Sequence, residues 1–509
     1  MSDESGARSG GLPGMGEVIL VGAGPGDIGL ITVRGLEVLR AADVVVYDRL
    51  VNPSLLAQCR NDAKLIYVGK GPGGMKQSEI NALLVEEARA GRTVCRLKGG
   101  DPFLFGRGGE EASHLVANGI PFEVVPGVTA AIAVPAYAGI PVSDRRLAST
   151  VAMVSGHAAE DDPDKRPPWS GLTGADTVIA LMGVANLRQM AAELLDSGRG
   201  PQLPAAVIEQ GTTPQQRTIV APLCRIADEA EAAGIGPPAV LVVGRVVDLR
   251  RELAWVERKA LWGLRALVTR PGGQAAALSR ALREAGAEPV EFPCIAVRPL
   301  PPDEDVLRLL DRAYDWVLFV SANGVSAAAA YLRAAGRDWR TLPAGKIGAV
   351  GPGTAAALEG FGFTADFMPS RYTVSALAAE LPGALEGKAV LLPGRAQVNP
   401  TLREGLAQRG AQLTVWPIYE IVTPQPAVAL ADLARPRLDL VTLTSSSAAR
   451  GFVDLGGARA AGDAIIACIG PPTAETARGL GLKVEVVAEE HTVSGLVAAI
   501  IRHRQGKSE

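Results

Sequence analysis

Net charge, histidine and paired cysteines are all scarce in this chain of 509 residues. Its net charge is −3 at pH 7, so it lacks the basic excess that nucleic-acid-binding proteins usually carry. The five cysteines form no C-x-x-C pair and the four histidines lack ligand-like spacing, which argues against a disulfide framework and a metal site. We therefore expect buried thiols in a reducing compartment and no metal cofactor.

Long apolar runs are absent as well. No stretch is long enough to span a bilayer, and no basic-then-apolar leader is recognisable. We expect a cytoplasmic protein without nucleic-acid or membrane partners. Residues 1–15 are rich in glycine and serine and are predicted to be a disordered tail. The length exceeds what one hydrophobic core can serve, which predicts more than one domain.

The region 16–250 alternates short Val/Ile/Leu-rich strands with helical stretches. This alternation predicts an α/β domain with a mainly parallel sheet. The expected strands are 17–21, 43–47, 64–68, 93–97, 121–125, 150–155, 176–181, 205–208 and 239–243, and the expected helices are 32–41, 79–90, 108–118 and 186–196. A mixed-charge segment, 251–263, is predicted to be a linker to the second half.

Two glycine-rich loops follow strands of this first half. One is Gly22-Ala-Gly-Pro-Gly-Asp27, and the other begins Gly99-Gly-Asp-Pro102. Glycine leaves main-chain groups uncovered and tolerates positive φ, so both loops suit the close approach of a ligand. The first loop departs from G-x-G-x-x-G and contains Pro25, so alone it is weak evidence for a nucleotide. Together with Pro126-Gly-Val-Thr-Ala-Ala131, the two loops predict an enzyme site.

The ordered motifs of residues 16–250 closely resemble the uroporphyrinogen-III C-methyltransferase family. They are VGAGPGD (21–27), ADVVVYDRLV (42–51), VGK (68–70), RLKGGDPFLFGRGGEE (96–111), PGVTAA (126–131) and AYAGIPV (136–142). The resemblance implies two α/β subdomains of the tetrapyrrole-methylase type that hold S-adenosylmethionine between them. The implied cofactor contacts are Pro25, Gly99, Gly100, Asp101, Leu104, Thr129, Ala130, Met182 and Gly211.

The same resemblance implies roles for two ionisable side chains. Asp48 follows strand 43–47 and matches the family's general base, and Lys70 matches its proton donor or anion contact. By itself, Asp48 is typical of a turn or helix cap and Lys70 of a solvated charge. Arg107 and Arg145 are candidate partners of substrate carboxylates, with surface ion pairs as the alternative.

Two positions depart from the family pattern. Leu181 stands where the family commonly has tyrosine, and Asp144 stands where it has histidine. Contacts made by those two family side chains are therefore not transferred to this chain.

The second half contains an internal repeat in permuted order. Segment 315–324 matches 439–448, 347–355 matches 466–474, and 389–420 matches 266–296 earlier in the chain. The permutation predicts a two-lobe α/β clamp over 264–505, with lobe one from 264–297 plus 420–505 and lobe two from 300–416. Ligands of open parallel sheets bind beyond the strand carboxyl ends, so those ends should line a cleft.

This half resembles uroporphyrinogen-III synthase. The motifs are LVTRP (267–271), FVSANGV (319–325), GAVGPGTA (348–355), TSSSA (444–448) and IGPPTA (469–474). The resemblance implies a linear tetrapyrrole polyanion as substrate, which helix N-termini and hydroxyl groups suit. Tyr419 matches the residue that assists loss of the substrate hydroxyl, with a tyrosine packed at the hinge as the alternative. The expected substrate contacts are Ser321, Asn323, Thr354, Ser445, Ser447 and Thr473, of which Ser321 and Ser447 equally suit helix capping.

The two resemblances imply consecutive steps of tetrapyrrole biosynthesis. The second half would cyclise hydroxymethylbilane to uroporphyrinogen III with inversion of the last pyrrole. The first would methylate that product at carbons 2 and 7 to precorrin-2, on the way to sirohaem or cobalamin, as a homodimer through its own half. The alternative is a methyltransferase for a later corrin precursor joined to a non-catalytic two-lobe binding half.

Overall fold

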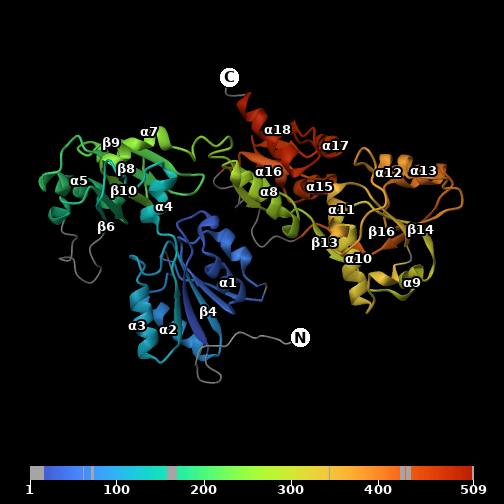
Figure 1. Ribbon diagram of the computed structural model, residues 1–509, viewed down its shortest axis with the longest axis horizontal. Helices are drawn as coiled ribbons and strands as arrows, with labels where there is room; N and C mark the ends of the chain where they lie inside the picture. Colours follow the sequence, from blue (N-terminus) through green and yellow to red (C-terminus); the bar gives the residue numbers. More distant parts are fainter. Residues whose placement is uncertain are drawn as a thin grey trace. The chain divides into compact units, whose positions relative to one another are not determined.

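The computed structural model describes residues 16–60, 62–69, 74–156, 169–342, 344–424, 430 and 437–506. They form two compact units, which Figure 1 colours from blue to green and from green to red. The first runs through Leu264 and includes Ala285–Glu288; the second comprises Arg265–Glu284 and the chain from Pro289 onward. The predicted tail, 1–15, lies outside the described residues. In the described part of the chain, no helix is both long and apolar enough to cross a membrane.

A five-stranded parallel sheet forms the first subdomain of the first unit. Its strands lie in the order β3-β2-β4-β1-β5. They are β1 (Glu17–Gly22), β2 (Val44–Tyr47), β3 (Lys64–Tyr67), β4 (Thr93–Lys98) and β5 (Phe122–Val125). Helix α1 (Val33–Ala41) packs on one face, and α2 (Gln77–Arg89) and α3 (Gly108–Ala117) pack on the other. Because both faces are covered, β1 and β2 are largely apolar, whereas β4 also carries the buried Arg96 and Lys98.

The second subdomain contains a mixed sheet, in the order β6-β7-β10-β8-β9. Its strands are β6 (Val151–Ser155), β7 (Thr177–Leu181), β8 (Pro204–Glu209), β9 (Arg217–Pro222) and β10 (Ala239–Val243). Strands β6 and β7 are parallel, whereas the β7–β10, β10–β8 and β8–β9 pairs are antiparallel. The sequence predicted a mainly parallel sheet throughout and did not predict β9. Helix α4 (Ala130–Tyr137) packs on one face, and α5 (Leu187–Asp196) and α6 (Ile226–Ala232) on the other.

The segment predicted as a linker, 251–263, packs into the first unit. The Trp255 indole N–H donates to the Ala136 carbonyl oxygen at 3.0 Å, and its ring lies edge-on to Tyr137, with ring centroids 5.3 Å apart. Val256 and Leu261 are buried. The first unit therefore extends to Leu264 rather than ending near residue 250.

The second unit contains two parallel sheets with corresponding strand orders. Lobe one has the order β12-β11-β19-β20-β21, and lobe two has β15-β14-β16-β17. The strands of lobe one are β11 (Arg265–Val268), β12 (Glu288–Glu291), β19 (Leu440–Leu443), β20 (Ile465–Cys468) and β21 (Val484–Val487). Those of lobe two are β14 (Tyr314–Phe319), β15 (Ala344–Ala349), β16 (Ala389–Gly394) and β17 (Gln412–Pro417). By the sequence matches, β19, β20, β11 and β12 correspond to β14, β15, β16 and β17, so equivalent strands are neighbours in both sheets.

Two antiparallel strands, β13 (Ala296–Pro299) and β18 (Tyr419–Val422), lie where the chain passes between the lobes. The longer helices of lobe one are α8 (Gly272–Glu284), α15 (Ser446–Asp454), α17 (Pro471–Gly479) and α18 (Val493–Gln505). Those of lobe two are α10 (Ala322–Ala334), α11 (Pro352–Glu359), α12 (Val374–Glu380) and α13 (Pro400–Gln408).

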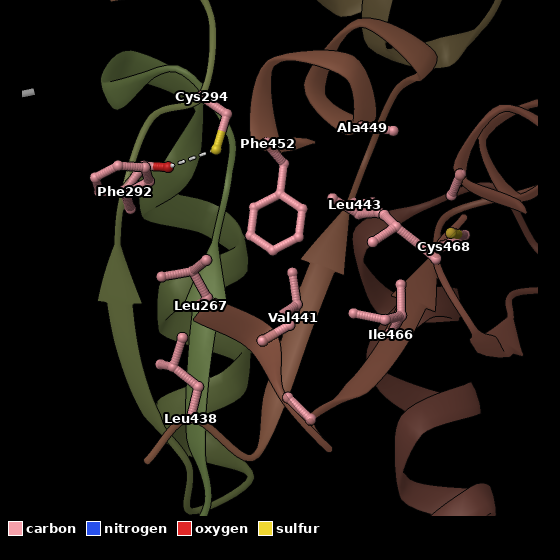
Figure 2. Close-up of a cluster of buried hydrophobic side chains, with 14 of the residues drawn as sticks. Leu267, Phe292, Cys294, Leu438, Val441, Leu443, Ala449, Phe452, Ile466 and Cys468 are labelled. Atoms are coloured by element: carbon pink, nitrogen blue, oxygen red, sulfur yellow. Dashed lines mark hydrogen bonds between the residues drawn. The ribbon is translucent and has the colours of Figure 1, made fainter. Parts of the chain in front are cut away.

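The core of lobe one is assembled from segments far apart in the sequence. Figure 2 shows Leu267 and Cys294 of the earlier segment beside Phe452 and Val441 of the later one, and Phe292 belongs to the same buried cluster. Phe452 is fully buried. The Cys294 thiol donates to the Phe292 carbonyl oxygen at 3.4 Å. Lobe one therefore needs both segments to complete its core.

Candidate functional site

Three glycine loops of the first unit meet at the carboxyl ends of β1, β4 and β5. The Gly100 N–H donates to the Gly24 carbonyl oxygen at 2.8 Å, and the Gly24 N–H donates back to Gly100 at 3.2 Å. A Cβ on Gly22 would lie 2.4 Å from the Gly127 Cα and 2.7 Å from the Gly100 carbonyl oxygen. The backbones of loops 22–27, 99–101 and 126–131 are thus in direct contact.

Asp101 fastens two of these loops together. One carboxylate oxygen, Oδ2, accepts the Gly127 N–H at 3.0 Å. The other, Oδ1, accepts the N–H groups of Phe103 at 2.8 Å and Leu104 at 3.0 Å. Both carboxylate oxygens of Asp101 therefore have partners within the protein and shape the loops, and its predicted contact with the cofactor stays a prediction.

A loop of the second subdomain reaches the same place. The Thr212 hydroxyl accepts the Asp27 N–H at 3.1 Å, and a Cβ on Gly26 would lie 2.9 Å from that hydroxyl oxygen. The Asp27 carboxylate accepts the Tyr137 hydroxyl at 2.8 Å. Burial and the Asp27 carboxylate raise the pKa of Tyr137. Sequence reasoning missed Thr212 and Tyr137, since neither contact is visible from local spacing.

Backbone strain is concentrated around this loop. Gln210 and Thr212, on either side of Gly211, have φ of 50° and 67°, and Met182 after β7 has φ of 56°. Residues other than glycine seldom adopt this left-handed region, and those that do often lie at functional sites. A Cβ on Gly211 would lie 2.3 Å from Val134 of α4, so the close fit of loop and helix requires glycine there.

The other predicted cofactor residues lie around α4. Thr129 is its N-cap, with the hydroxyl accepting the Ala131 N–H at 3.2 Å, and Ala130 is its first residue. Leu104, Ala130 and Leu181 pack against one hydrophobic cluster. Met182 follows Leu181 and is 46% exposed, and Pro25 lies in the β1 loop.

Asp48 follows β2, and its two carboxylate oxygens make different contacts. Its Oδ1 accepts the Leu50 N–H at 3.0 Å, which is the turn role considered as the alternative. Its Oδ2 lies 3.7 Å from Nη2 of Arg96, and the side chain is 27% exposed. The turn therefore leaves one carboxylate oxygen near the strand ends. Lys70 lies outside the described residues.

The two arginines predicted to meet substrate carboxylates differ in their surroundings. Arg107 precedes α3 with φ of 59° and donates to Glu110 at 2.9 and 2.8 Å, which is the ion pair considered as the alternative. Arg145 is exposed. Its neighbour Asp144 accepts from Arg146 at 3.0 Å, and this hydrogen bond lowers the pKa of Asp144.

Sequence reasoning also missed a buried group of charges next to Asp48: Arg96 and Lys98 on β4, and Glu111 on α3. The sequence contained a sign of this group, because Arg96 and Lys98 are two residues apart on one strand and so share a face of the sheet.

In the second unit, Tyr419 begins β18, is 5% exposed, and has its hydroxyl 3.4 Å from the Ser321 hydroxyl. Ser321 caps α10 by accepting the Gly324 N–H at 3.1 Å. Tyr419 also packs in the lobe-two core, as in the alternative of a packed tyrosine, and its role in loss of the substrate hydroxyl stays a prediction.

The remaining predicted substrate contacts lie at helix N-termini. Ser445 caps α15 by accepting the Ala448 N–H at 3.1 Å, whereas Ser447, considered as a cap, lies inside that helix. Asn323 of α10 accepts a hydrogen bond from Gln274 of α8, which joins the two lobes. Thr354 and Thr473 lie in the first turns of α11 and α17 and are largely buried. Among the described residues, no cluster of three His, Cys, Asp or Glu side chains suits a metal ion.

Comparison with known proteins assigns each unit to a family. The family Tetrapyrrole (Corrin/Porphyrin) Methylases matches residues 17–227, and the family Uroporphyrinogen-III synthase HemD matches residues 276–498. Porphyrin biosynthesis protein HemD of Ruminiclostridium josui is 39% identical over 495 residues, covering 96% of this chain and 98% of its own. Uroporphyrinogen-III C-methyltransferase of Methanocaldococcus jannaschii is 52% identical over 237 residues, covering 46% and 98%.

A solved structure of uroporphyrin-III C-methyl transferase from Thermus thermophilus, complexed with S-adenyl homocysteine, is 42% identical. It covers 46% of this chain and all of its own, with a TM-score of 0.41. By the family models and the sequence identities given above, the first unit is a tetrapyrrole methylase and the second a uroporphyrinogen-III synthase. The chain belongs to the family of porphyrin biosynthesis proteins represented by the Ruminiclostridium josui protein, which confirms both resemblances noted in the sequence.

Proposed function

We propose that this protein catalyses two consecutive steps of tetrapyrrole biosynthesis. The second unit cyclises hydroxymethylbilane to uroporphyrinogen III with inversion of the last pyrrole. The first unit methylates that product at carbons 2 and 7 to precorrin-2, with S-adenosylmethionine as methyl donor. The observation that carries the methyltransferase assignment is the direct backbone contact of loops 22–27, 99–101 and 126–131 in a chain of this family.

The loops of the first unit suit a nucleoside ligand. The glycines at positions 22 and 127 let the three loops pack backbone to backbone, and a Cβ on Gly100 would have no neighbour nearer than 3.8 Å, so the main chain at Gly100 is uncovered. S-adenosylmethionine supplies an already activated methyl group, so the protein's task is to align it with a pyrrole carbon. The proposed contacts are Pro25, Gly99, Gly100, Asp101, Leu104, Thr129, Ala130, Met182 and Gly211.

Asp48 is the proposed general base of the first unit. When a pyrrole carbon gains a methyl group, the macrocycle gains positive charge and must lose a proton. The Oδ2 of Asp48 can accept that proton, because Oδ1 is already engaged by the Leu50 N–H. Lys70 is the proposed proton donor or anion contact, and Arg107 and Arg145 are proposed to bind substrate carboxylates.

Tyr419 is the proposed acid of the second unit. Its hydroxyl, close to that of Ser321, would donate a proton to the hydroxyl that leaves hydroxymethylbilane. Substrate carboxylates would bind at the N-termini of α10, α11, α15 and α17, whose exposed N–H groups attract anions. The contacts there would come from Ser321, Asn323, Thr354, Ser445, Ser447 and Thr473. We further propose a cytoplasmic location and a homodimer formed through the methyltransferase unit.

A coupled assay tests both activities. Hydroxymethylbilane and S-adenosylmethionine are added to the whole chain, and dipyrrocorphin absorbance is followed while the uroporphyrinogen isomers are separated chromatographically. We expect type-III isomer and growing absorbance. Supplying uroporphyrinogen III directly tests the methyltransferase alone. A folded protein that leaves the spectrum unchanged with either substrate contradicts the methyltransferase assignment, and methylation of a later corrin precursor would then identify the alternative substrate. Failure to form the type-III isomer contradicts the synthase assignment.

A further inference from the structure

A buried group of charges lies behind Asp48 in the first subdomain. Arg96 and Lys98 of β4 are 3% and 4% exposed, and Glu111 of α3 is fully buried. The two cations share a strand face because they are two residues apart. Charged side chains are rarely buried this far unless they are paired, so the contacts within this group need an explanation.

One carboxylate oxygen of Glu111 organises the group. Its Oε1 accepts hydrogen bonds from Lys98 Nζ at 2.8 Å, Gln77 Nε2 at 3.1 Å and Arg96 Nε at 3.2 Å. Its Oε2 is buried and has no hydrogen-bond partner among the described residues. Glu111 thus holds both cations from the side of α3.

Arg96 connects this group to Asp48. Its Nη1 donates to the carbonyl oxygens of Val46 at 3.3 Å and Leu97 at 3.2 Å, and its Nε is held by Glu111. Its Nη2 faces Asp48 Oδ2 at 3.7 Å. The guanidinium is therefore held on two sides by the fold, and its remaining edge is directed at the carboxylate oxygen that the β2 turn leaves available.

The charges of this group also connect it to Asp48. The group contains two cations and, in Glu111, one fully buried anion; Asp48 is the second anion. Burial and the neighbouring Arg96 charge lower the pKa of Lys98, which shows how closely the cations are enclosed. Buried ion pairs add little stability compared with apolar packing, so stability alone does not account for this group.

We propose that Glu111 is a positioning residue for methyl transfer, which acts through Arg96 to hold Asp48 Oδ2 toward the substrate. The inference rests on the proposed function, in which Asp48 is the base. Glu111 itself touches neither donor nor substrate in this account. It fixes the direction of Arg96, and Arg96 fixes Asp48.

A double-mutant cycle separates this role from a structural one. Glu111→Gln is made in the wild-type and in the Asp48→Asn background, and kcat for methylation of uroporphyrinogen III is measured with the dissociation constant of S-adenosylhomocysteine. We expect Glu111→Gln to lower kcat about tenfold or more in the wild type and by less than about twofold in Asp48→Asn, since a residue acting through Asp48 cannot act without it. The dissociation constant should change less than about twofold in either background.

Glu87→Gln is the matched control. Glu87 is another buried carboxylate, on α2, and pairs with Lys64 at 2.6 Å and Arg92 at 2.9 Å at the opposite ends of the strands. The Glu87→Gln substitution should lower the stability of the protein as Glu111→Gln does, and should leave kcat of the folded enzyme unchanged. If Glu111→Gln fails to fold, Arg96→Lys, which keeps the charge and loses the contact with Asp48, replaces it in the cycle.

The outcomes are distinguishable. Equal losses of kcat in both backgrounds, or an unchanged kcat in the wild type, overturn the positioning role and leave the proposed function intact. Full activity of Asp48→Asn alone overturns the proposed base, and with it the reason for the cycle.

Discussion

Replacing Gly22 with alanine would place a methyl group where the backbones of two other loops already lie. The added Cβ would be 2.4 Å from Gly127 Cα, 2.5 Å from Gly127 N and 2.7 Å from the Gly100 carbonyl oxygen, and real Cβ atoms essentially never approach within 3.0 Å. All three neighbours are backbone atoms, so no side-chain rotation relieves the contact. At least one of the loops must move.

The size of the effect follows from the cost of overpacking. Inserting a methyl group into a close-packed region costs about 1–3 kcal/mol. If this cost destabilises the loop arrangement that binds S-adenosylhomocysteine, the affinity for that ligand falls roughly five- to a hundredfold. The conversion follows because about 1.4 kcal/mol corresponds to a factor of ten in the dissociation constant. Isothermal titration calorimetry measures this directly.

Two controls accompany the measurement. Gly200→Ala adds the same methyl group where nothing lies within 4 Å, so its affinity should equal that of the wild type. Formation of the type-III isomer by the Gly22→Ala protein should be unchanged, because Gly22 belongs to the first unit. Wild-type affinity in Gly22→Ala would refute the argument that these three loops form the wall of the cofactor site.

Three further predictions concern stability and the second unit. Phe452→Ala removes a fully buried ring from the core that joins two distant segments of lobe one (Figure 2). It should lower the unfolding free energy of the second unit, measured by urea titration, by about 3–5 kcal/mol. A loss below about 1 kcal/mol would contradict the burial of Phe452 in that core. Hydrogen bonds from the backbone N–H groups of Ser149 and Thr150 lower the pKa of Asp176 from its ordinary value to about 2. The stabilisation that this carboxylate provides is therefore complete above its ordinary pKa and is lost as pH falls through the lowered one. The difference in unfolding free energy between wild type and Asp176→Asn should therefore shrink as pH falls between these two pKa values. A difference that grows on acidification would contradict the lowered pKa of Asp176. Tyr419→Phe keeps the packed ring and removes the hydroxyl near Ser321, so type-III isomer formation should fall by about tenfold or more with little change in stability; an unchanged rate would exclude the tyrosine as the acid.

Local sequence patterns predicted most of the first unit because most of its strands are short runs rich in Val, Ile or Leu that are bounded by loops. Strand β1 and helix α1 begin and end within one residue of the expected ranges 17–21 and 32–41. Strand β9 was missed although residues 218–221 are mostly apolar; it is a partly exposed strand at the sheet edge that pairs only with β8.

The parts of the site that sequence could not predict depend on long-range contacts. Thr212 meets Asp27 across 185 positions of the chain, and no local spacing encodes that pairing. The motif around Asp101 also gave no sign that its carboxylate accepts hydrogen bonds from three main-chain N–H groups, one of them in the distant loop 126–131.

The sequence by itself determined the two-unit α/β organisation, the order of the motifs, the permuted matches of the second half and the resemblance to both families, because periodicity and glycine spacing are local properties. Tertiary structure decided which main-chain groups touch at loops 22–27, 99–101 and 126–131, that residues 251–263 pack into the first unit, and that Glu111 and Arg96 stand behind Asp48. The physical reason is that such contacts depend on how strands are ordered in a sheet and how helices cover it, and that order places residues far apart in the chain next to one another.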